Sequence, residues 1–317
     1  MDSRRIGRSD LTTAPIALGS SVFGWTVPEG TAFDILDRFV ARGFDLIDTA
    51  DVYYLWANGN RGGESETIIG NWLKSRGGRD RVKIATKVGE SFGDERQGLK
   101  RDYIMAGVEA SLKRLQTDYI DLYQAHIDDP ETPLDETLEA FDRLIEAGKA
   151  RVIGASKYEA LRLAAALETS AAKGLPRFES FQTLYNLYDR AVYEKELAPI
   201  CRSQDLGVLT YRSLAQGFLT GKYRALASSG QSPRGSTAIN YLNERGLRIL
   251  AAVDAVAEEQ AATPAQVALA WLIARPTVAA AIVSASRPEQ MDAVLDAATL
   301  ALTSEQVAAL DGASQEA

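Results

Sequence analysis

Four side chains that can carry charge or exchange protons stand where buried strands are expected to end. In the stretch FDLIDTADVYY, residues 44–54, an apolar strand breaks at Asp48 into a polar turn that carries Tyr53. Lys87 ends the strand VKIAT, and His126 ends the strand YIDLYQA. Taken alone, a carboxylate such as Asp48 is more often a cap for the next helix than a catalytic group. Because three consecutive strands each end in an ionisable side chain, we interpret the four residues as one shared site.

These residue types together suit acid catalysis by a tyrosine. A tyrosine hydroxyl has an ordinary pKa of about 10, so Tyr53 exchanges protons near neutral pH only if a nearby cation favours its phenolate form. Lys87 is the expected cation, and Asp48 is the fixed anion that a buried ammonium needs. His126 is expected to donate a hydrogen bond to a carbonyl oxygen. The alternative is a core histidine bonded to a backbone carbonyl, but His126 is the only histidine in the chain.

Strands and helices alternate along the chain around these positions. Apolar runs rich in strand-forming residues predict eight strands, near residues 15–18, 44–48, 82–87, 119–125, 151–155, 179–183, 207–210 and 280–284. Amphipathic helices between them imply parallel pairing, as a barrel or as a doubly wound sheet. The strand number, the length and the lack of a GxGxxG motif after the first strand favour an α/β fold of the (β/α)8 TIM-barrel type. We expect one domain over residues 1–317, with its active site at the C-terminal ends of the strands.

Smaller signals predict how the barrel is closed and capped. The residues before Leu18 alternate around a turn-like stretch at 7–10, which predicts an N-terminal β-hairpin that closes one end of the fold. Thr263 and Thr303 each begin a capping box at a helix start. Residues 223–243, which contain SSGQSPRGS, are the nearest candidate for a linker between domains, but a loop over the site explains them as well.

Composition limits the classes of protein that this chain can be. A hydrophobic fraction of 46% in 317 residues allows a sizeable core. A net charge of −8 argues against a nucleic-acid or anionic-membrane partner. No apolar run reaches the roughly 18 residues that a membrane helix needs, and we expect a cytoplasmic protein. One cysteine and one histidine leave no internal disulfide and no His/Cys zinc cluster, so we expect no metal and place Cys201 in the core.

Six segments together resemble one enzyme family. DTADVY, the TKVG around Lys87, DYIDLYQAH, GKARVIGAS, FQTLYNLYDR and LTGKY follow the order and spacing of the aldo-keto reductase superfamily over nearly the whole chain. The resemblance implies a (β/α)8 barrel with a nicotinamide cofactor, and Asp48, Tyr53, Lys87 and His126 match the family's catalytic tetrad. It also implies hydride transfer to a carbonyl carbon while Tyr53 protonates the oxygen. The reverse reaction would oxidise an alcohol with Tyr53 as base, and an enzyme that works mainly as an alcohol or aldose dehydrogenase is an alternative.

The resemblance also assigns residues to the cofactor. Ser156 and Gln182 match the positions that hold the nicotinamide carboxamide, and Tyr211 matches the aromatic that stacks on the ring. Residues 212–222 match the segment over the pyrophosphate, in line with the rule that barrels bind phosphate after strands 7 and 8. Arg287, at a helix start, suits a 2′-phosphate and favours NADP(H) over NAD(H). The other positions assigned to the cofactor are Trp25, Asp48, Lys157, Arg212, Ser213, Leu214, Gln216, Gly217, Lys222, Ser284, Ser286 and Gln290.

Some of these positions depart from the family pattern. Lys157 stands where an asparagine usually contacts the carboxamide, and Arg212 with Ser213 replaces a common Ser-Pro. Ala293 and Val294 replace a Glu-Asn pair that usually holds the adenine. We therefore expect weaker or differently distributed cofactor affinity. Alternatively, Lys157 and Arg212 are solvated side chains whose stems lie on the barrel rim.

The expected substrate is a small carbonyl compound or alcohol. Trp25, Tyr54 and Trp56 place aromatic rings around the mouth, where they suit a sugar, a flat aromatic carbonyl or a polyketide-like ligand. Glu64 and Glu66 are expected to start the next helix rather than to contact substrate. The leading hypothesis is an NADP(H)-dependent reductase of aldehydes or ketones, with a sugar or an aromatic carbonyl as candidate substrates.

Two other classes stay open. The resemblance extends to the β subunits of voltage-gated potassium channels, so the chain is alternatively a cofactor-sensing protein with little turnover. The complete tetrad, and the missing pair at the adenine, favour the enzyme. A barrel scaffold without chemistry would leave four ionisable groups at one mouth unexplained. The oligomeric state does not follow from the sequence.

Overall fold

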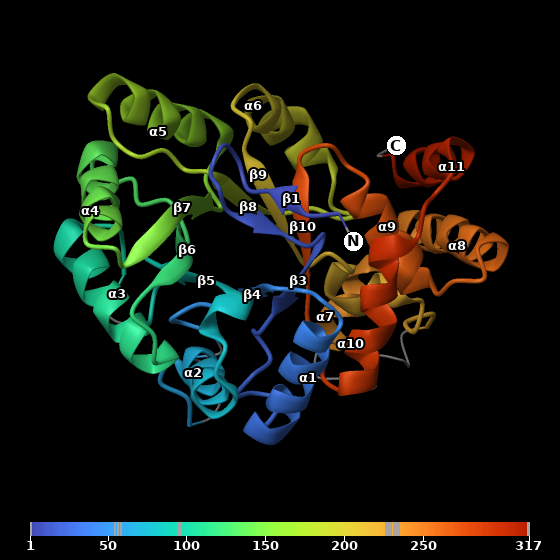
Figure 1. Ribbon diagram of the computed structural model, residues 1–317. Coiled ribbons are helices and arrows are strands. Elements are labelled where there is room, and N and C mark those ends of the chain that lie inside the picture. The colour runs from blue at the N-terminus through green and yellow to red at the C-terminus, as the bar shows by residue number, and fades with distance from the viewer. Residues whose placement is uncertain are drawn as a thin grey trace.

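A closed barrel of parallel strands forms the centre of the molecule (Figure 1). The computed structural model describes residues 2–53, 55, 57, 59–93, 97–225, 230 and 235–315. Around the barrel the strand order is β10-β3-β4-β5-β6-β7-β8-β9. The strands are β3 (Ile16–Gly19), β4 (Leu46–Asp48), β5 (Lys83–Val88), β6 (Ile120–Ala125), β7 (Ala150–Ser156), β8 (Ser180–Leu184), β9 (Gly207–Tyr211) and β10 (Val278–Val283). The predicted (β/α)8 barrel is confirmed, and each strand lies within two residues of its predicted range.

Helices between the strands cover the outside of the barrel (Figure 1). In α4, Leu138, Phe141 and Leu144 are fully buried, and their spacing puts them on one face of the helix. Both predicted capping boxes are present, at Thr263 before α9 and at Thr303 before α11. The α-helices are α1 (Glu29–Ala41), α2 (Glu64–Arg76), α3 (Arg101–Leu115), α4 (Leu134–Glu146), α5 (Ala160–Lys173), α6 (Ala198–Ser203), α7 (Gly235–Ala238), α8 (Glu244–Glu259), α9 (Pro264–Ile273), α10 (Pro288–Leu295) and α11 (Ser304–Ser314). Shorter helical turns are η1 (Arg79–Arg81), η2 (Tyr193–Leu197), η3 (Ala215–Thr220), η5 (Ile239–Tyr241) and η6 (Asp296–Thr299).

The predicted N-terminal hairpin closes the amino-terminal end of the barrel. β1 (Arg4–Arg5) pairs antiparallel with β2 (Thr12–Thr13). Between them Ile6 and Leu11 are buried in one cluster with side chains from the barrel interior. Burial of an aliphatic side chain of this size contributes about 1.5–3 kcal/mol. The opposite end of the barrel, where the strands terminate, is therefore the end that a ligand can enter.

The segment 223–243 is only partly the loop that the sequence predicts. Its described residues include two short helices, α7 and η5. Just before it, η3 is interrupted at Gln216 and Gly217, whose φ angles are 57° and 94°. Residues 226–229 and 231–234 lie outside the described part of the chain.

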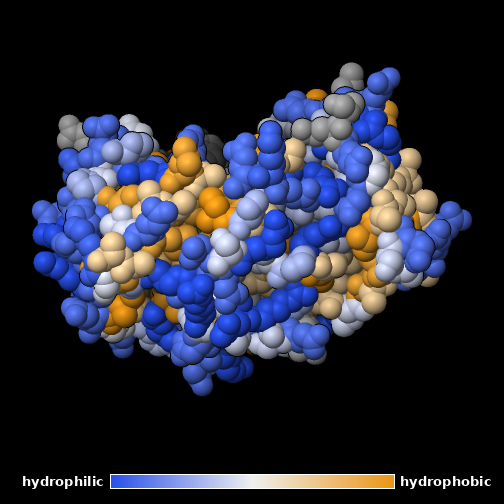
Figure 2. All heavy atoms as spheres, turned by 90° about the horizontal axis from the view of Figure 1, so that it is seen from above, coloured by the Kyte–Doolittle hydropathy of each residue, from blue (hydrophilic) through white to orange (hydrophobic). Residues whose placement is uncertain are grey.

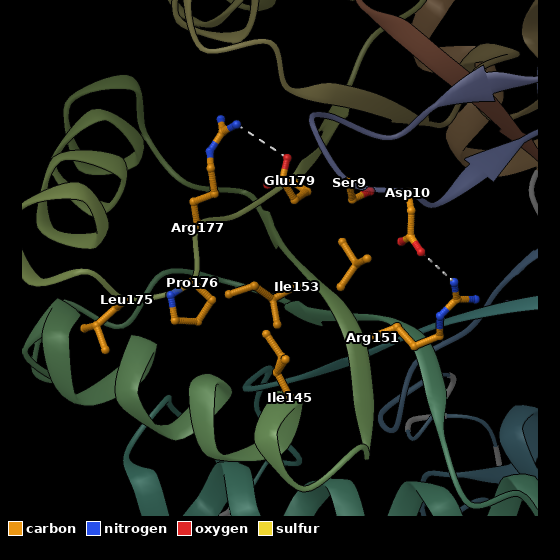
Figure 3. Close-up of a pocket in the computed structure, with 10 residues that line it drawn as sticks. Ser9, Asp10, Ile145, Arg151, Ile153, Leu175, Pro176, Arg177 and Glu179 are labelled. Carbon is orange, nitrogen blue, oxygen red and sulfur yellow. Dashed lines mark hydrogen bonds and ion pairs between the residues drawn. The ribbon is translucent and has the colours of Figure 1, made fainter.

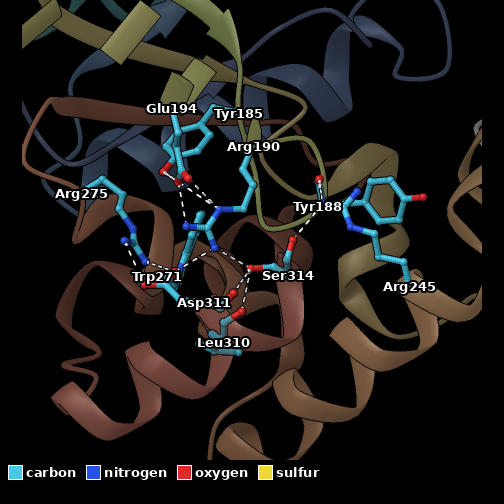
Figure 4. A network of polar contacts seen from close by, with 10 residues as sticks. All are labelled: Tyr185, Tyr188, Arg190, Glu194, Arg245, Trp271, Arg275, Leu310, Asp311 and Ser314. Atoms are coloured by element: carbon cyan, nitrogen blue, oxygen red, sulfur yellow. Dashed lines mark hydrogen bonds and ion pairs between the residues drawn. The ribbon is translucent and has the colours of Figure 1, made fainter. Parts of the chain in front are cut away.

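Helix α11 is fixed to the barrel by a network of charged and polar contacts (Figure 4). Asp311 accepts hydrogen bonds from Trp271 Nε1 at 2.9 Å, Arg275 Nη2 at 2.8 Å and Arg190 Nη1 at 2.9 Å. Arg190 follows β8 and also pairs with Glu194. The network thus joins the C-terminal helix to α9 and to the loop after β8.

The surface is mixed in character. In the view from above, polar and charged side chains cover much of the face, and hydrophobic side chains lie among them in smaller groups (Figure 2). Within the described ranges no single helix has both the length and the apolar character to cross a membrane. Residues 288–299 and 304–314 pass the same test only as a sharply bent pair.

Candidate active site

Asp48, Tyr53 and Lys87 meet in one hydrogen-bonded group at the C-terminal end of the barrel. Lys87 is fully buried, and its ammonium uses three donors, to Asp48 Oδ2 at 2.9 Å, Thr49 O at 2.7 Å and Tyr53 OH at 2.7 Å. Tyr53 OH in turn donates to Asp48 Oδ2 at 3.1 Å. The other carboxylate oxygen, Oδ1, accepts from Gln182 Nε2 at 2.8 Å. The phenol therefore lies against a cation that a buried anion holds in place.

His126 completes the group from the next strand. It follows β6, its backbone N donates to Val88 O at 2.8 Å, and its ring packs edge-on to the ring of Tyr53 with centroids 6.1 Å apart. Burial, together with the charges of Lys87 and Lys157, lowers the pKa of His126 well below its ordinary value. The imidazole is therefore neutral at neutral pH.

The position of the imidazole proton follows from its surroundings. Within the described structure His126 Nδ1 is buried and has no hydrogen-bond partner. A buried N–H without an acceptor costs more than an unused lone pair, so the proton belongs on Nε2. Glu90 Oε2 lies 3.7 Å from that atom. His126 can thus present an Nε2–H donor at the mouth of the barrel.

Strand register explains why these residues converge. β4, β5 and β6 are neighbours in the barrel, with Asp48 opposite Ala85 and Lys87 opposite Gln124. Parallel strands end at the same edge of a sheet, so side chains 39 positions apart in the sequence reach one point. The structure brings the four predicted tetrad residues together.

Burial and charge act on the lysine in opposite directions. Burial lowers the pKa of Lys87, while the carboxylate of Asp48 raises it, and the net pKa is below the ordinary value.

A second buried acid, Asp51, was not predicted from the sequence. Burial, and then the charge of Glu66, raise the pKa of Asp51 well above its usual range. Burial therefore favours the protonated form of Asp51 next to the tetrad.

The residues predicted to hold a carboxamide and a ring lie on three adjacent strand ends. Ser156 ends β7 and pairs in register with Gln182 of β8, and Tyr211 ends β9 beside them. Ser156 Oγ is buried without a hydrogen-bond partner among the described residues. Lys157 follows Ser156 in a left-handed conformation with φ 57°, and its ammonium pairs with Glu90.

Several residues in the segment after β9 have a left-handed backbone conformation. Arg212, Ala215, Gln216 and Gly217 all have positive φ, so the backbone turns sharply there. Arg212 and Lys222 are exposed. Other members of the predicted set serve the fold: Ser213 Oγ is buried and donates to Ile282 O at 2.8 Å, and Leu214 is partly buried against the core.

The last predicted cofactor positions follow β10, the strand next to β9. Ser286 N and Oγ donate to Gln290 Oε1 at 3.0 and 2.9 Å. Arg287 is exposed and is the residue before the first turn of α10. Ser284 is partly exposed at the end of β10. Apart from Trp25 and Asp48, the predicted cofactor residues thus form one arc along the rim, from β7 to β10.

The residues on this arc fit a dinucleotide. Ser156 has an unused buried hydroxyl of the kind that a carboxamide can satisfy. Backbone N–H groups in a turn with left-handed residues, as after β9, are typical of phosphate-binding loops. Arg212, Lys222 and Arg287 supply exposed positive charge on the same rim. These groups are of the kinds that an anionic ligand with an amide at one end can use.

Sequence reasoning missed some residues near the site and could not test others. Glu66 does start α2, as predicted, but it is fully buried and accepts from Thr86 Oγ1 at 2.5 Å and Arg114 Nε at 2.7 Å. Glu90 was also missed, although it follows a strand end as the tetrad residues do. Trp25 is partly buried against the core. Of the predicted substrate residues, Tyr54 and Trp56 lie outside the described residues.

A separate pocket of about 380 Å³ lies at the amino-terminal end of the barrel, beside the hairpin (Figure 3). Its two arginines are already paired, Arg151 with Asp10 and Arg177 with Glu179. It is remote from the tetrad, and we take it as a gap between the hairpin and the strand starts.

Across the described ranges, no group of three or more His, Cys, Asp or Glu side chains is arranged to hold a metal ion.

Comparison with known proteins finds similarity over nearly the whole chain. The family model described as "Aldo/keto reductase family" matches residues 15–315. An uncharacterized oxidoreductase, YrpG, from Bacillus subtilis is 34% identical over 312 residues, which cover 96% of this chain and 93% of that protein. Norsolorinic acid reductase B from Aspergillus parasiticus is 30% identical over 96% of this chain and 82% of its own. A putative voltage-gated potassium channel subunit beta from Schizosaccharomyces pombe is 33% identical over 91% and 85%.

Proposed function

This chain belongs to the aldo/keto reductase family, and we propose on that premise that it reduces an aldehyde or ketone to the alcohol with a nicotinamide cofactor. The observation that carries the proposal is the 2.7 Å contact of Lys87 Nζ with Tyr53 OH, beside the buried carboxylate of Asp48. Relatives named as an oxidoreductase and as a reductase support it. When bound, the reduced nicotinamide supplies a hydride to the carbonyl carbon.

Tyr53 is the proposed general acid. Its hydroxyl gives its proton to the carbonyl oxygen as negative charge develops there, and Lys87 stabilises the phenolate that remains. The long 3.1 Å bond from Tyr53 to Asp48 is the one that a substrate oxygen replaces. In the reverse direction the phenolate takes the proton of an alcohol.

His126 is proposed to orient the carbonyl. Its neutral imidazole donates from Nε2 to the carbonyl oxygen, which polarises the bond and fixes the face that is attacked. Asp48 does not take up the proton in this scheme. It holds Lys87 in place and keeps the ammonium charged in spite of its burial.

We further propose that the cofactor is NADP(H). Ser156 and Gln182 would hold the carboxamide, and Tyr211 would stack on the ring. The backbone between Arg212 and Gly217 would bind the phosphates. Arg287 supports the choice of NADP(H) over NAD(H), because an exposed guanidinium at a helix start suits a 2′-phosphate. The proposed partner is a small carbonyl compound or alcohol.

The test follows absorbance at the reduced-nicotinamide band with NADPH and NADH separately, against small aldehydes, aromatic ketones and keto sugars. Tyr53→Phe should abolish turnover and still bind cofactor, seen as quenching of tryptophan fluorescence. Tyr119→Phe is the matched control, because Tyr119 precedes β6 at the far end of the barrel. Full activity of Tyr53→Phe would refute the mechanism, and turnover with NADH alone would refute the choice of NADP(H).

A cofactor-sensing protein is the second candidate, favoured by the relative named as a putative channel subunit beta. The same assay separates the two functions. A sensor quenches tryptophan fluorescence on binding the cofactor but consumes none with any carbonyl of the panel.

A further inference from the structure

An ion pair crosses the mouth of the barrel at the catalytic imidazole. β5, β6 and β7 are neighbours in that order. Glu90 lies two residues after β5, His126 directly after β6 and Lys157 directly after β7. The pair between Glu90 and Lys157 therefore spans the end of β6, where His126 emerges. Glu90 Oε2, the oxygen that pairs with Lys157, is also the one that lies 3.7 Å from His126 Nε2.

The backbone determines where the two charges stand. Lys157 has φ 57°, a left-handed conformation that a residue with a Cβ adopts only when its surroundings hold it there. Its backbone N donates to Gln182 O at 3.3 Å, across to the next strand. Gly89, with φ 111°, makes the turn that places Glu90 after β5. Each charged residue is thus anchored close to the end of its strand.

Both charges act on the groups of the site. Lys157 contributes, after burial and Lys87, to the lowered pKa of His126, and it also contributes to the lowered pKa of Lys87. Burial raises the pKa of Tyr211, and the charge of Glu90 adds to that effect. Glu90 and Lys157 are about one-third exposed, with 32% and 39% of their side chains accessible. A substrate whose carbonyl oxygen meets His126 Nε2 would lie close to this pair, because Glu90 Oε2 is 3.7 Å from that nitrogen.

We propose, building on the reductase function above, that Glu90 and Lys157 select carbonyl compounds with a hydroxyl on the carbon next to the carbonyl carbon. A carboxylate can only accept hydrogen bonds and an ammonium can only donate them. A hydroxyl does both, so it donates to Glu90 and accepts from Lys157 while the carbonyl oxygen meets His126. An alkyl group in that place displaces water from Glu90 and Lys157 but forms no hydrogen bond with either side chain, so its binding is less favourable.

The same geometry disfavours a carboxylate beside the carbonyl. Such a group would pair with Lys157, but it would also meet the negative charge of Glu90 at the same point. The expected substrates are therefore neutral α-hydroxy aldehydes and α-hydroxy ketones, rather than α-keto acids or unsubstituted alkyl carbonyls.

The experiment uses two substrate pairs that differ only by a hydroxyl in place of a methyl group. Hydroxyacetone is compared with butan-2-one, and glycolaldehyde with propanal, as the ratio of their kcat/KM values with the preferred cofactor. Wild-type protein should favour the hydroxylated member by about tenfold or more, and Glu90→Leu should bring the ratio close to one. A ratio measured on one preparation does not depend on how much of it is folded.

The matched control is Glu109→Leu, which removes the acid of the ion pair between α3 and Lys149 on the outside of the barrel. This variant should keep the wild-type ratio. Glu90→Gln, which keeps an acceptor but removes the charge, should give an intermediate ratio.

Every other outcome overturns the inference, and the failures are distinguishable. A wild-type ratio near one, or an unchanged ratio in Glu90→Leu, removes the role of the ion pair but leaves the reductase. If the protein reduces other carbonyl compounds but none of the four test substrates, the role of the ion pair is likewise removed and the reductase function stays. If no carbonyl is reduced with NADPH or NADH, the proposed function itself fails and the inference with it.

Discussion

Replacement of Lys87 by Met tests how much of the chemistry depends on the ammonium beside the phenol. Methionine keeps the length and apolar stem of lysine but loses the charge. At 2.7 Å, with an effective dielectric constant of about 20, the ammonium stabilises a Tyr53 phenolate by about 6 kcal/mol. Water entering the variant site would replace part of that energy. If about 4 kcal/mol is lost, kcat falls about 1,000-fold.

The same change also weakens the fold, and the two effects can be separated. Lys87→Met leaves Asp48, which is 2% exposed, without its cation, and removing one partner of a buried pair costs about 3–5 kcal/mol. Adding Asp48→Asn removes the remaining buried charge. The double variant should recover thermal stability but no activity, with kcat measured at saturating cofactor and normalised to folded protein.

Two results would refute this reasoning. One is a Lys87→Met variant that keeps more than about one-tenth of the wild-type kcat, since the lost stabilisation would then be below about 1.4 kcal/mol. The other is a double variant that regains activity together with stability. In that case the loss in Lys87→Met came from an unpaired Asp48 and not from the missing ammonium.

Three further predictions concern protonation. Because the pKa of His126 lies well below its usual value, the ring signals of this single histidine should not shift between about pH 6 and 8 by NMR; a midpoint near the ordinary value of about 6.5 would contradict a neutral imidazole in the site. Burial alone would raise the pKa of Asp311, but the bond from Trp271 and the charge of Arg275 hold it below its usual range. A lowered carboxyl pKa stabilises the fold above the unfolded-state value of about 3.9 and ceases to do so as the pH falls through the folded-state pKa. Asp311→Asn should therefore lose roughly 1–3 kcal/mol in urea unfolding at pH 7 and progressively less below about pH 4, and a loss that did not depend on pH would exclude a charge effect. Burial raises the pKa of Cys201 to about 12, so a thiol-specific reagent should modify it only after unfolding, and rapid labelling of native protein would show that the residue is accessible.

The barrel could be predicted because its signals are local. Alternation between apolar runs and amphipathic helices needs only neighbouring residues, and so do the capping boxes at Thr263 and Thr303. The hairpin around residues 7–10 is also local, since a short turn determines its pairing. Segment 223–243 was harder to predict, because α7 and η5 are too short to show a helical period.

The catalytic group could be predicted for a related reason. In a parallel barrel every strand ends at the same rim, so an ionisable residue at a strand end is placed before any contact is known. Asp48, Lys87 and His126 were found in this way. The resemblance then added the cofactor positions, whose binding role remains a prediction.

By itself the sequence determined which residues face inward and which strand ends carry charge, because side-chain direction follows the period of each element. Only the tertiary structure decided which charges meet. The pair of Glu90 and Lys157 depends on two loops that reach across β6, and the burial of Glu66 against Thr86 and Arg114 depends on how α2 and α3 pack. These contacts join residues that are 20 to 67 positions apart in the sequence. The periodic pattern of apolar residues within a helix or strand cannot predict contacts at such separations. They follow from the closure of the barrel, which determines which strands, and therefore which loops and helices, lie next to one another.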